Sequence, residues 1–400
     1  MLKQLKARPL WRTQVDSTWR APSACLFLSA LVFTSALLLS GCRPNLAGSS
    51  SGKGYPDRVL GPMAYSPNGN LLAVGYYGSS GGEVEVWDTR NPNKPTAVLP
   101  AHGEEVESLA FSGDSKLLAY GGSRGDGVVR VVDTTNLKGS PVELRGHASD
   151  VRSIAMSPDG HTLATVDLNN TLKIWDISNL QSAALTKTVQ RGGLTNMLAI
   201  SPDGQTMAIA SLLSTEVELR KVSDPGGSAT ILHGTLNPES PPVFSPDGRY
   251  LAIGASTANL PGTPVASLTS AMLTSAVELW DLSAPGTAPW LLTGNVSMSV
   301  GGVAFSPDGK WLADAKIDAG LVEVWDMSSV SSEQHPVATA IEWKGAPARV
   351  FRHDAAYSVA FSPDGKTLAS GSMHTSIKLW EYLQASAVPT VLADPSPSQP

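Results

Sequence analysis

The sequence predicts an all-β fold, a seven-bladed β-propeller with four-stranded antiparallel blades. A turn tetrapeptide, Ser-Pro-Asp-Gly or a close variant, occurs seven times, and short apolar strands flank each copy. The copies are separated by 46, 45, 44, 44, 61 and 56 residues, and a base period of about 45 residues is typical of propeller blades. One repeat is too small to bury its own apolar face, so the repeats are expected to stack into a ring.

The first 41 residues have the order of a secretory signal peptide. Residues 1–20 are basic, residues 24–39 form an apolar run, and the small residues of Leu39-Ser40-Gly41-Cys42 end it. The apolar run is shorter than the roughly 20 residues that span a bilayer comfortably. The alternative is an uncleaved membrane helix with an incidental cysteine.

The last four residues of this segment resemble the lipobox of bacterial lipoproteins. The resemblance implies cleavage between Gly41 and Cys42 and acylation of Cys42 with palmitate or similar chains. Two or three acyl chains anchor a protein durably, which one chain does not. The mature protein would lie on the extracytoplasmic side of the cell membrane or, because Arg43 follows the cysteine, on the outer membrane of a two-membrane bacterium. Cys25 would be lost with the signal, which leaves Cys42 without a disulfide partner.

Three parts are expected after the signal. Residues 42–58 hold the lipidated cysteine and a Ser/Gly-rich flexible tether, residues 59–394 form the propeller, and residues 395–400 form a frayed tail. The formal charge is −6 for the whole chain, and the 24 basic and 34 acidic residues that follow residue 41 give −10. This acidity, without clusters of Lys or Arg, argues against a nucleic acid or an anionic membrane surface as the ligand.

The turn tetrapeptide predicts a hairpin between the first two strands of each blade. Proline presets the first central residue of a type I turn, and glycine takes the positive φ that closes the hairpin. A short apolar strand such as Val303-Ala304-Phe305 precedes the turn and suits the inner position of a blade. The strand after the turn carries a recurring Leu-Ala, as in Leu312-Ala313, and the small alanine suits close packing between sheets.

The third strand alternates with period two, as in Val84-Glu85-Val86-Trp87-Asp88, and five of the ten tryptophans share its penultimate position. Blade four is degenerate and has Arg220-Lys221 there. Fourth strands are predicted at Pro95–Leu99, Pro141–Leu144, Leu185–Val189, Ala229–Leu232, Pro289–Leu292 and Pro347–Phe351. Residues 388–392 repeat the pattern of these strands, so the C-terminus is expected to complete blade seven.

These landmarks resemble the WD40 family. Trp-Asp stands at 87–88, 175–176, 280–281 and 325–326, Gly146-His147 precedes an inner strand, and His102 and His353 hold the same offset in their blades. The match covers about residues 59–394. The resemblance implies a scaffold that binds other proteins. The alternative is a TolB-like propeller, a family that shares the Ser-Pro-Asp-Gly turn but not the Trp-Asp.

WD40 blades often join His, Ser or Thr, Asp and Trp in a hydrogen-bonded tetrad. The resemblance implies related networks in two blades, each with the acid replaced: His147, Thr165, Asn169 and Trp175 in blade three, and His353, Ser370, His374 and Trp380 in blade seven. A His beside a Ser in this setting stabilises a blade and is not half of a hydrolase.

Motifs for catalysis and cofactors are missing from the sequence. There is no Gly-x-Ser-x-Gly, His-Glu-x-x-His, phosphate loop or Cys-x-x-Cys, and the seven histidines have no close pairs. We therefore expect no catalytic residues, metal or cofactor, and a monomeric scaffold for an unidentified protein partner. The alternatives are a propeller enzyme resembling a metal-dependent lactonase and a structural subunit of an envelope assembly machine.

Two insertions lengthen the repeats, at 255–276 in blade five and at 328–346 after Trp325. The first is uncharged and includes Leu260, Leu268 and Met272. Exposed apolar residues tend to mark interfaces, so these three residues, with Tyr76 and Tyr77, are candidate partner contacts on one face of the ring. The alternatives are tolerated loop growth and local packing, in which Leu268 and Met272 cap blade five.

Overall fold

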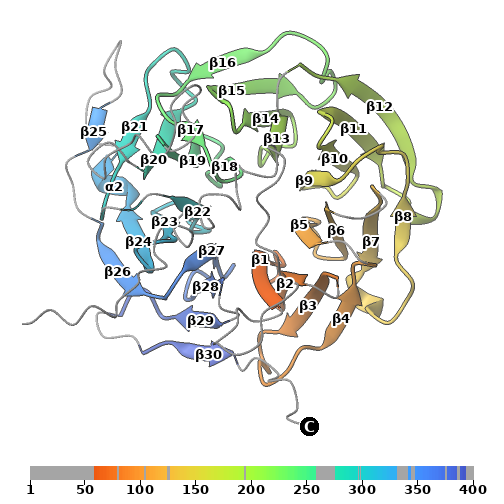
Figure 1. Cartoon of the computed structure of the whole chain (residues 1–400), viewed down its shortest axis with the longest axis horizontal. Coiled ribbons are helices and arrows are strands. Elements are labelled where there is room, and N and C mark those ends of the chain that lie inside the picture. The colour runs from red at the N-terminus through yellow and green to blue at the C-terminus, as the bar shows by residue number, and fades with distance from the viewer. Residues whose placement is uncertain are drawn as a thin grey trace, which may run out of the picture. The chain divides into compact units, whose positions relative to one another are not determined.

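The structure is a computed structural model, and it describes residues 58–78, 81–102, 105–123, 127–192, 195–257, 275–295, 297, 299–330, 341–343, 347–373, 376–384 and 388–392. The predicted signal, Cys42 and the tether before Arg58 lie outside the described residues, as do the predicted tail and the heart of the first insertion. The described part forms a ring of seven blades, six with four antiparallel strands and one with six strands (Figure 1). The predicted seven-bladed propeller is therefore confirmed.

The inner strands lie around the centre of the ring (Figure 1). They are β1 (Arg58–Tyr65), β5 (Glu105–Phe111), β9 (Val151–Met156), β13 (Thr195–Ile200), the pair β17 (Asn237–Pro238) and β18 (Val243–Phe244), β22 (Val300–Phe305) and β27 (Ala356–Phe361). The second strands are β2 (Leu71–Gly78), β6 (Leu117–Ser123), β10 (Thr162–Asp167), β14 (Thr206–Ser211), β19 (Tyr250–Ser256), β23 (Trp311–Lys316) and β28 (Leu368–Ser372).

The third and fourth strands follow toward the outside of each blade. The third strands are β3 (Glu83–Asp88), β7 (Val129–Asp133), β11 (Thr171–Asp176), β15 (Ser214–Lys221), β20 (Ser275–Asp281), β24 (Leu321–Asp326) and β29 (Ile377–Trp380). The fourth strands are β4 (Ala97–Pro100), β8 (Val142–Leu144), β12 (Ala184–Gln190), β16 (Thr230–His233), β21 (Trp290–Leu292), β26 (Arg349–Arg352) and β30 (Thr390–Leu392). All the predicted fourth strands are confirmed within a few residues.

The C-terminus closes the ring. β30 pairs with β29 in the register Ile377↔Leu392, so blade seven takes its outer strand from the end of the chain, as predicted. Blade seven then packs against blade one, because Leu60 and Trp87 share an apolar cluster with Ala369 and Ile377. This contact between the first and last blades makes the stack a closed ring.

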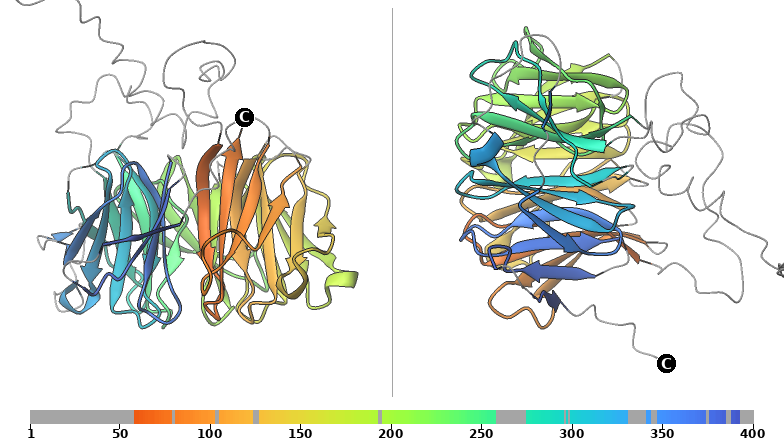
Figure 2. Two further views of the ribbon diagram at one scale, coloured as in Figure 1. Left: turned by 90° about the horizontal axis from the view of Figure 1, so that it is seen from below. Right: turned by 90° about the vertical axis from the view of Figure 1, so that its left-hand side faces the viewer.

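The turn tetrapeptides act as their sequence predicts. In blade three the Gly160 N–H donates to the Ser157 carbonyl at 2.9 Å, and Gly160 has φ +71°. The Ser157 hydroxyl donates to Asp159 and accepts the Thr162 N–H at 2.9 Å, which fixes the start of the next strand. Strands run between two faces of the ring (Figure 2), and we call the face that carries these turns the turn face.

The core consists of layers between blades. Seven of the apolar clusters each combine residues of two neighbouring blades. The recurring alanines of the second strands lie inside these layers with no exposed surface: Ala73, Ala119, Ala164, Ala208, Ala252, Ala313 and Ala369. Any larger side chain there would push neighbouring sheets apart.

Blade five departs from the regular pattern in three ways. Its inner strand is split into β17 and β18 around Pro241 and Pro242, which cannot donate ladder hydrogen bonds. β19 and β20 run to Ser256 and from Ser275, so the first insertion is shorter than the predicted 255–276. A short strand from the second insertion, β25 (Ile341–Trp343), pairs in parallel with β21 on the outer edge.

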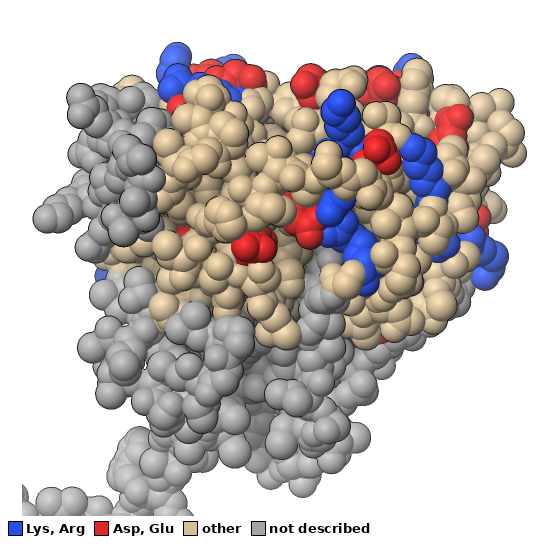
Figure 3. All heavy atoms as spheres, turned by 90° about the horizontal axis from the view of Figure 1, so that it is seen from above, with Lys and Arg blue, Asp and Glu red and all other residues tan. Residues whose placement is uncertain are grey.

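Helical structure is sparse. The described residues contain a four-residue α2 (Met327–Val330) and the 3-10 turns η2 (Thr134–Asn136) and η3 (Leu180–Ser182). None of the helices in the described part has the length and hydropathy needed to cross a bilayer. On the side drawn in Figure 3, acidic and basic side chains are interspersed.

Candidate functional site

The His147 side chain is the centre of a closed polar network in blade three. Its Nδ1 lies 3.0 Å from Asp167 Oδ2, and its Nε2 lies 2.7 Å from Thr165 Oγ1. The Trp175 indole donates to the same Thr165 oxygen at 2.9 Å. With the imidazole proton on Nδ1, the ring donates to the carboxylate and accepts from the hydroxyl, so every polar group has a partner. Burial lowers the pKa of His147, and the neighbouring Asp167 opposes that shift.

The prediction of Asn169 as the fourth member was wrong. Asn169 is exposed, and its backbone N–H binds the Ser149 hydroxyl. The acid is Asp167, two residues after Thr165 on β10, and residues two apart on a strand face the same side. The network thus contains His, Thr, Asp and Trp in full, with its acid two positions earlier than the family spacing implies.

Blade seven holds a similar network without a carboxylate. His353 Nδ1 lies 2.7 Å from Ser370 Oγ, and the Trp380 indole donates to that oxygen at 2.8 Å. His353 Nε2 lies 2.8 Å from Ser376 Oγ, and the predicted member His374 lies outside the described residues. Burial, with Lys378 nearby, lowers the pKa of His353 to about 4. Because both ring nitrogens are used and the histidine is 1 % exposed, this Ser–His contact is structural.

In blades five and six a buried glutamate of the third strand holds the loop that enters the blade. Glu278 Oε1 accepts the backbone N–H groups of Thr235 and Leu236 at 2.6 and 3.1 Å. Glu323 Oε1 accepts the Asn295 N–H at 2.8 Å. Burial raises the pKa of each carboxyl to about 7. These glutamates bind the entering loop from the blade, whereas His147 and His353 belong to the entering loops and bind the second strands of their blades.

Tyr76 belongs to the core, so its prediction as a partner contact was wrong. It is 2 % exposed, and its hydroxyl donates to Glu85 Oε2 at 3.0 Å. The Trp87 indole donates to the same oxygen at 3.1 Å. Tyr76 and Glu85 together give blade one a polar network in place of the histidine tetrad. Leu260, Leu268 and Met272 lie outside the described residues.

A β-bulge recurs at one position of the inner strands. The pairing register shifts at Gly61-Pro62, Glu107, Arg152, Asn196, Gly301-Gly302 and Tyr357. Each bulge begins five residues before the serine of the following turn, so it has the same place in six blades. Bulges re-aim a side chain and are common beside functional sites.

Side chains from four neighbouring blades meet at these bulges. Arg152 Nη1 of blade three lies 3.0 Å from Glu107 Oε1 of blade two. Tyr77 of blade one lies close enough to Tyr357 of blade seven for each tyrosine to shift the pKa of the other. We call Tyr77, Glu107, Arg152 and Tyr357 the inner rim. All four are partly exposed, so Tyr77 is the candidate contact that the structure places in an accessible cluster.

The inner rim is tightly built. A Cβ on Gly301 would lie 2.3 Å from the Tyr357 carbonyl oxygen, so glycine is required there, and a Cβ on Gly61 would lie 2.9 Å from the Tyr77 ring and would displace that ring. Burial raises the pKa of Tyr77, and Tyr357 and Glu107 add to the shift. Burial also raises the pKa of Glu107, although Arg152 opposes it.

Sequence reasoning missed Glu107, Arg152 and Tyr357. Their fixed distance from the turn could have identified them. At that position a polar or large residue interrupts a strand whose other residues are mostly apolar or small. As for metal chemistry, no three His, Cys, Asp or Glu side chains of the described part lie together as metal ligands would.

Comparison with known proteins supports the repeat assignment. The profile of the family "WD domain, G-beta repeat" matches residues 93–133, 139–176 and 345–381. Each match starts near the fourth strand of one blade and ends with the third strand of the next, so the sequence repeat is offset from the structural blade. Periodic tryptophan protein 2 of Arabidopsis thaliana is 27% identical over 270 residues, which are 67% of this chain and 27% of that protein. The chain therefore spans about a quarter of that relative.

Among solved structures, Hydrazine Synthase of Kuenenia stuttgartiensis has the same fold. It superposes with a TM-score of 0.66 over 86% of this chain and 99% of that chain, at 20% sequence identity. At this identity the likeness concerns the fold alone.

Proposed function

We propose that this WD-repeat-like propeller is a non-enzymatic scaffold that binds a protein partner at its inner rim, and that acyl chains on Cys42 anchor it to the outer side of a bacterial membrane. One observation carries the binding proposal. Three residues at inner-strand bulges, Glu107, Arg152 and Tyr357, form one partly exposed cluster with Tyr77, which lies on β2 beside the bulge of blade one.

The chemistry of the inner rim is suited to protein recognition. Tyrosine and arginine are enriched among the residues that dominate binding energies in protein interfaces. The Tyr77 ring packs against the backbone at Gly61, and Arg152 is held by Glu107, so these two side chains lose little freedom when a partner binds. The buried His, Ser, Asp and Glu side chains described above are engaged in holding blades and loops, so the binding proposal rests on the partly exposed inner rim.

Replacing Arg152 by alanine tests the binding proposal. We expect the affinity for the partner to fall by about tenfold or more, because truncating an arginine that dominates an interface costs about 2 kcal/mol or more. The partner is first isolated with the wild-type protein from detergent-solubilised membranes, and dissociation constants are then measured with purified components. Arg90→Ala is the matched control, since Arg90 is exposed and pairs with Asp88 of its own turn. Equal affinities for the wild type and Arg152→Ala would contradict the proposal.

Replacing Cys42 by serine tests the anchor. A hydroxyl cannot take the thioether-linked lipid, so we expect an uncleaved precursor or a released protein. Cell fractionation, with mass spectrometry of the mature N-terminus, reads out both outcomes. Cys25→Ser is the control, and it should leave processing unchanged. A Cys42→Ser protein that is cleaved and membrane-bound like the wild type would refute lipid anchoring.

A further inference from the structure

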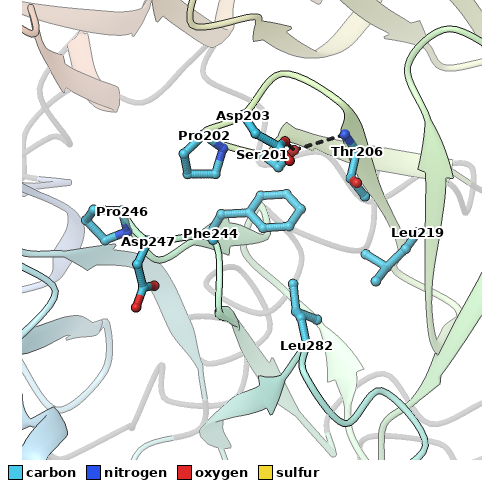
Figure 4. A pocket seen from close by; sticks show the side chains of 10 residues that line it. Ser201, Pro202, Asp203, Thr206, Leu219, Phe244, Pro246, Asp247 and Leu282 are labelled. Carbon is cyan, nitrogen blue, oxygen red and sulfur yellow. Dashed lines mark hydrogen bonds between the residues drawn. The ribbon is translucent and has the colours of Figure 1, made fainter.

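A hollow opens between blades four and five on the turn face. It has a volume of about 500 Å³. Figure 4 shows the Phe244 ring beside Pro202, with Leu219 and Leu282 below it. The lining consists of Ser201, Pro202, Asp203, Thr206, Leu219, Phe244, Pro246, Asp247, Gly248 and Leu282. We call this hollow the slot.

Aromatic rings fill the same position between blades six and seven. Thr206 of blade four and Trp311 of blade six hold equivalent positions. Each is the first residue of its second strand and pairs with the last residue of the third strand, Lys221 or Asp326. Leu282 follows the third strand of blade five, and Tyr382 stands close behind that of blade seven. Trp311 packs edge-on against Tyr382 at 6.3 Å between ring centroids. Tyr382 in turn contacts Phe361, the counterpart of Phe244, at 4.9 Å.

The slot therefore lacks the two rings that occupy the equivalent space between blades six and seven. Threonine and leucine stand where tryptophan and tyrosine stand between blades six and seven, and the volume they leave is open to solvent. The propeller thus contains its own example of what fits: an aromatic ring against a Phe wall, beside the proline of a turn.

The charge of the slot is negative. Two of its ten lining residues, Asp203 and Asp247, are acidic, and none is basic. Hydrogen bonds from Ser201 and Ser245 are the main reason that the pKa of each carboxyl is lowered, so both are ionised at neutral pH. Arg249, next to the slot, has its guanidinium bound to Asp281 at 2.8 Å. An incoming side chain thus meets an apolar wall with two carboxylates at its edge.

We propose that the slot binds an aromatic side chain of a partner protein, presented in a segment that carries Lys or Arg next to the aromatic residue. This docking site does not depend on the inner rim. It lies at the turns that precede the second strands, whereas Tyr77 lies at the other end of such a strand. One propeller then engages two partners, or two regions of one partner, at opposite ends of its strands.

Filling the slot is the main test. The probe is the peptide acetyl-Lys-Trp-Lys-amide, compared with acetyl-Lys-Ala-Lys-amide and acetyl-Glu-Trp-Glu-amide by calorimetry on the intact propeller. Thr206→Trp reproduces Trp311 and should lower the affinity for the first peptide by about tenfold or more. Thr162→Trp is the matched control, because Thr162 has the same register in blade three and borders a separate hollow. That variant should bind like the wild type.

Charge is tested with Asp203→Asn and Asp247→Asn together. Blade one shows that its turn tolerates this change, because Asn68 accepts the Ser66 hydroxyl at 2.8 Å as aspartate does elsewhere. We expect the double variant to bind Lys-Trp-Lys up to about fivefold more weakly than the wild type does. The difference in affinity between Lys-Trp-Lys and Glu-Trp-Glu should also become smaller. If Thr206→Trp lowers the melting temperature, Leu282→Tyr fills the slot from the other side. The proposal is overturned if Lys-Trp-Lys binds no better than Lys-Ala-Lys, or if filling the slot leaves its affinity unchanged.

Discussion

Replacing Asp167 by alanine is expected to lower the free energy of unfolding by about 3 kcal/mol. The Asp167 carboxylate has no exposed surface and lies 3.0 Å from His147 Nδ1. It also accepts the Thr171 N–H at 2.9 Å, which holds the turn between β10 and β11. Its removal leaves a buried imidazole donor and a backbone N–H without their partner. The loss exceeds that of an ordinary surface change because water cannot reach the imidazole.

Asn169→Ala is the discriminating control for this prediction. Asn169 is exposed, and its backbone N–H, which alanine retains, makes the bond to Ser149. We expect a change below about 0.5 kcal/mol. Urea unfolding followed by tryptophan fluorescence measures both variants, and Asp167→Asn, which keeps one acceptor, should fall between them. Equal losses for the two alanine variants would contradict the role of Asp167 as the member of the network that stabilises the blade.

Local chemistry explains why so much of the fold was predictable. The Ser-Pro-Asp-Gly turn is settled within five residues, since Ser157 binds both Asp159 and the N–H of Thr162. Strand order then follows, because each turn joins two adjacent strands and each repeat supplies four of them. The C-terminal closure was predictable for the same reason: residues 388–392 repeat the pattern of an outer strand.

The candidate site was harder to predict because its contacts join distant parts of the chain. Asp167 and His147 are 20 residues apart, and family spacing favoured Asn169, although the alternation along β10 pointed to Asp167. Glu107 and Arg152 are 45 residues apart, and only the bulge that displaces each from the ladder brings them together. A bulge interrupts the alternation of apolar and polar residues from which strands are predicted. The residues at a bulge therefore look like irregular positions of the strand and not like members of a site.

A hollow such as the slot is still harder to predict from a sequence, because it results from side chains that are smaller than their counterparts in another blade. Thr206 is an ordinary residue at the start of a strand, and its position matters only when it is compared with Trp311 in the same register. Tyr76 gave the opposite error, because it was predicted to lie on the surface and is buried. A pair of tyrosines suggested a surface, but alternation turns Tyr76 toward Glu85 in the core and Tyr77 toward the inner rim.

The second large effect expected is a pH-dependent gain in stability on replacing Glu278 by glutamine. Burial raises the pKa of Glu278 in the folded protein to about 7, from an ordinary value of 4.5. Between these two pH values Glu278 keeps its proton in the folded state and has lost it in the unfolded state. The contribution of this group to the stability of the folded protein therefore falls as pH rises from 4.5 to 7. The full loss is about 3 kcal/mol, because each pKa unit corresponds to about 1.4 kcal/mol.

Other groups titrate in the same range, so the difference between variant and wild type is the informative quantity. The pKa of His353 is lowered to about 4, and stability from this group rises with pH between about 4 and its ordinary value of 6.5. That trend opposes the one from Glu278 in the wild-type curve, but it is common to both proteins and cancels in the difference. Glu323, with its pKa also raised to about 7, cancels in the same way.

Glutamine suits this test because it keeps the contacts and cannot ionise. The Glu278 Oε1 atom accepts the N–H groups of Thr235 and Leu236, and an amide oxygen can replace it. The Oε2 atom is buried without a hydrogen-bond partner, so a carboxylate is poorly solvated there. At pH 5 we expect the free energy of unfolding of the variant to equal that of the wild type or to be lower. By pH 8 it should have risen by about 2–3 kcal/mol relative to the wild type. Urea midpoints at both pH values measure this, with the exposed Glu216→Gln as the control. A difference that stays constant from pH 5 to pH 8 would mean that Glu278 is ionised throughout and that its hydrogen bonds outweigh its burial.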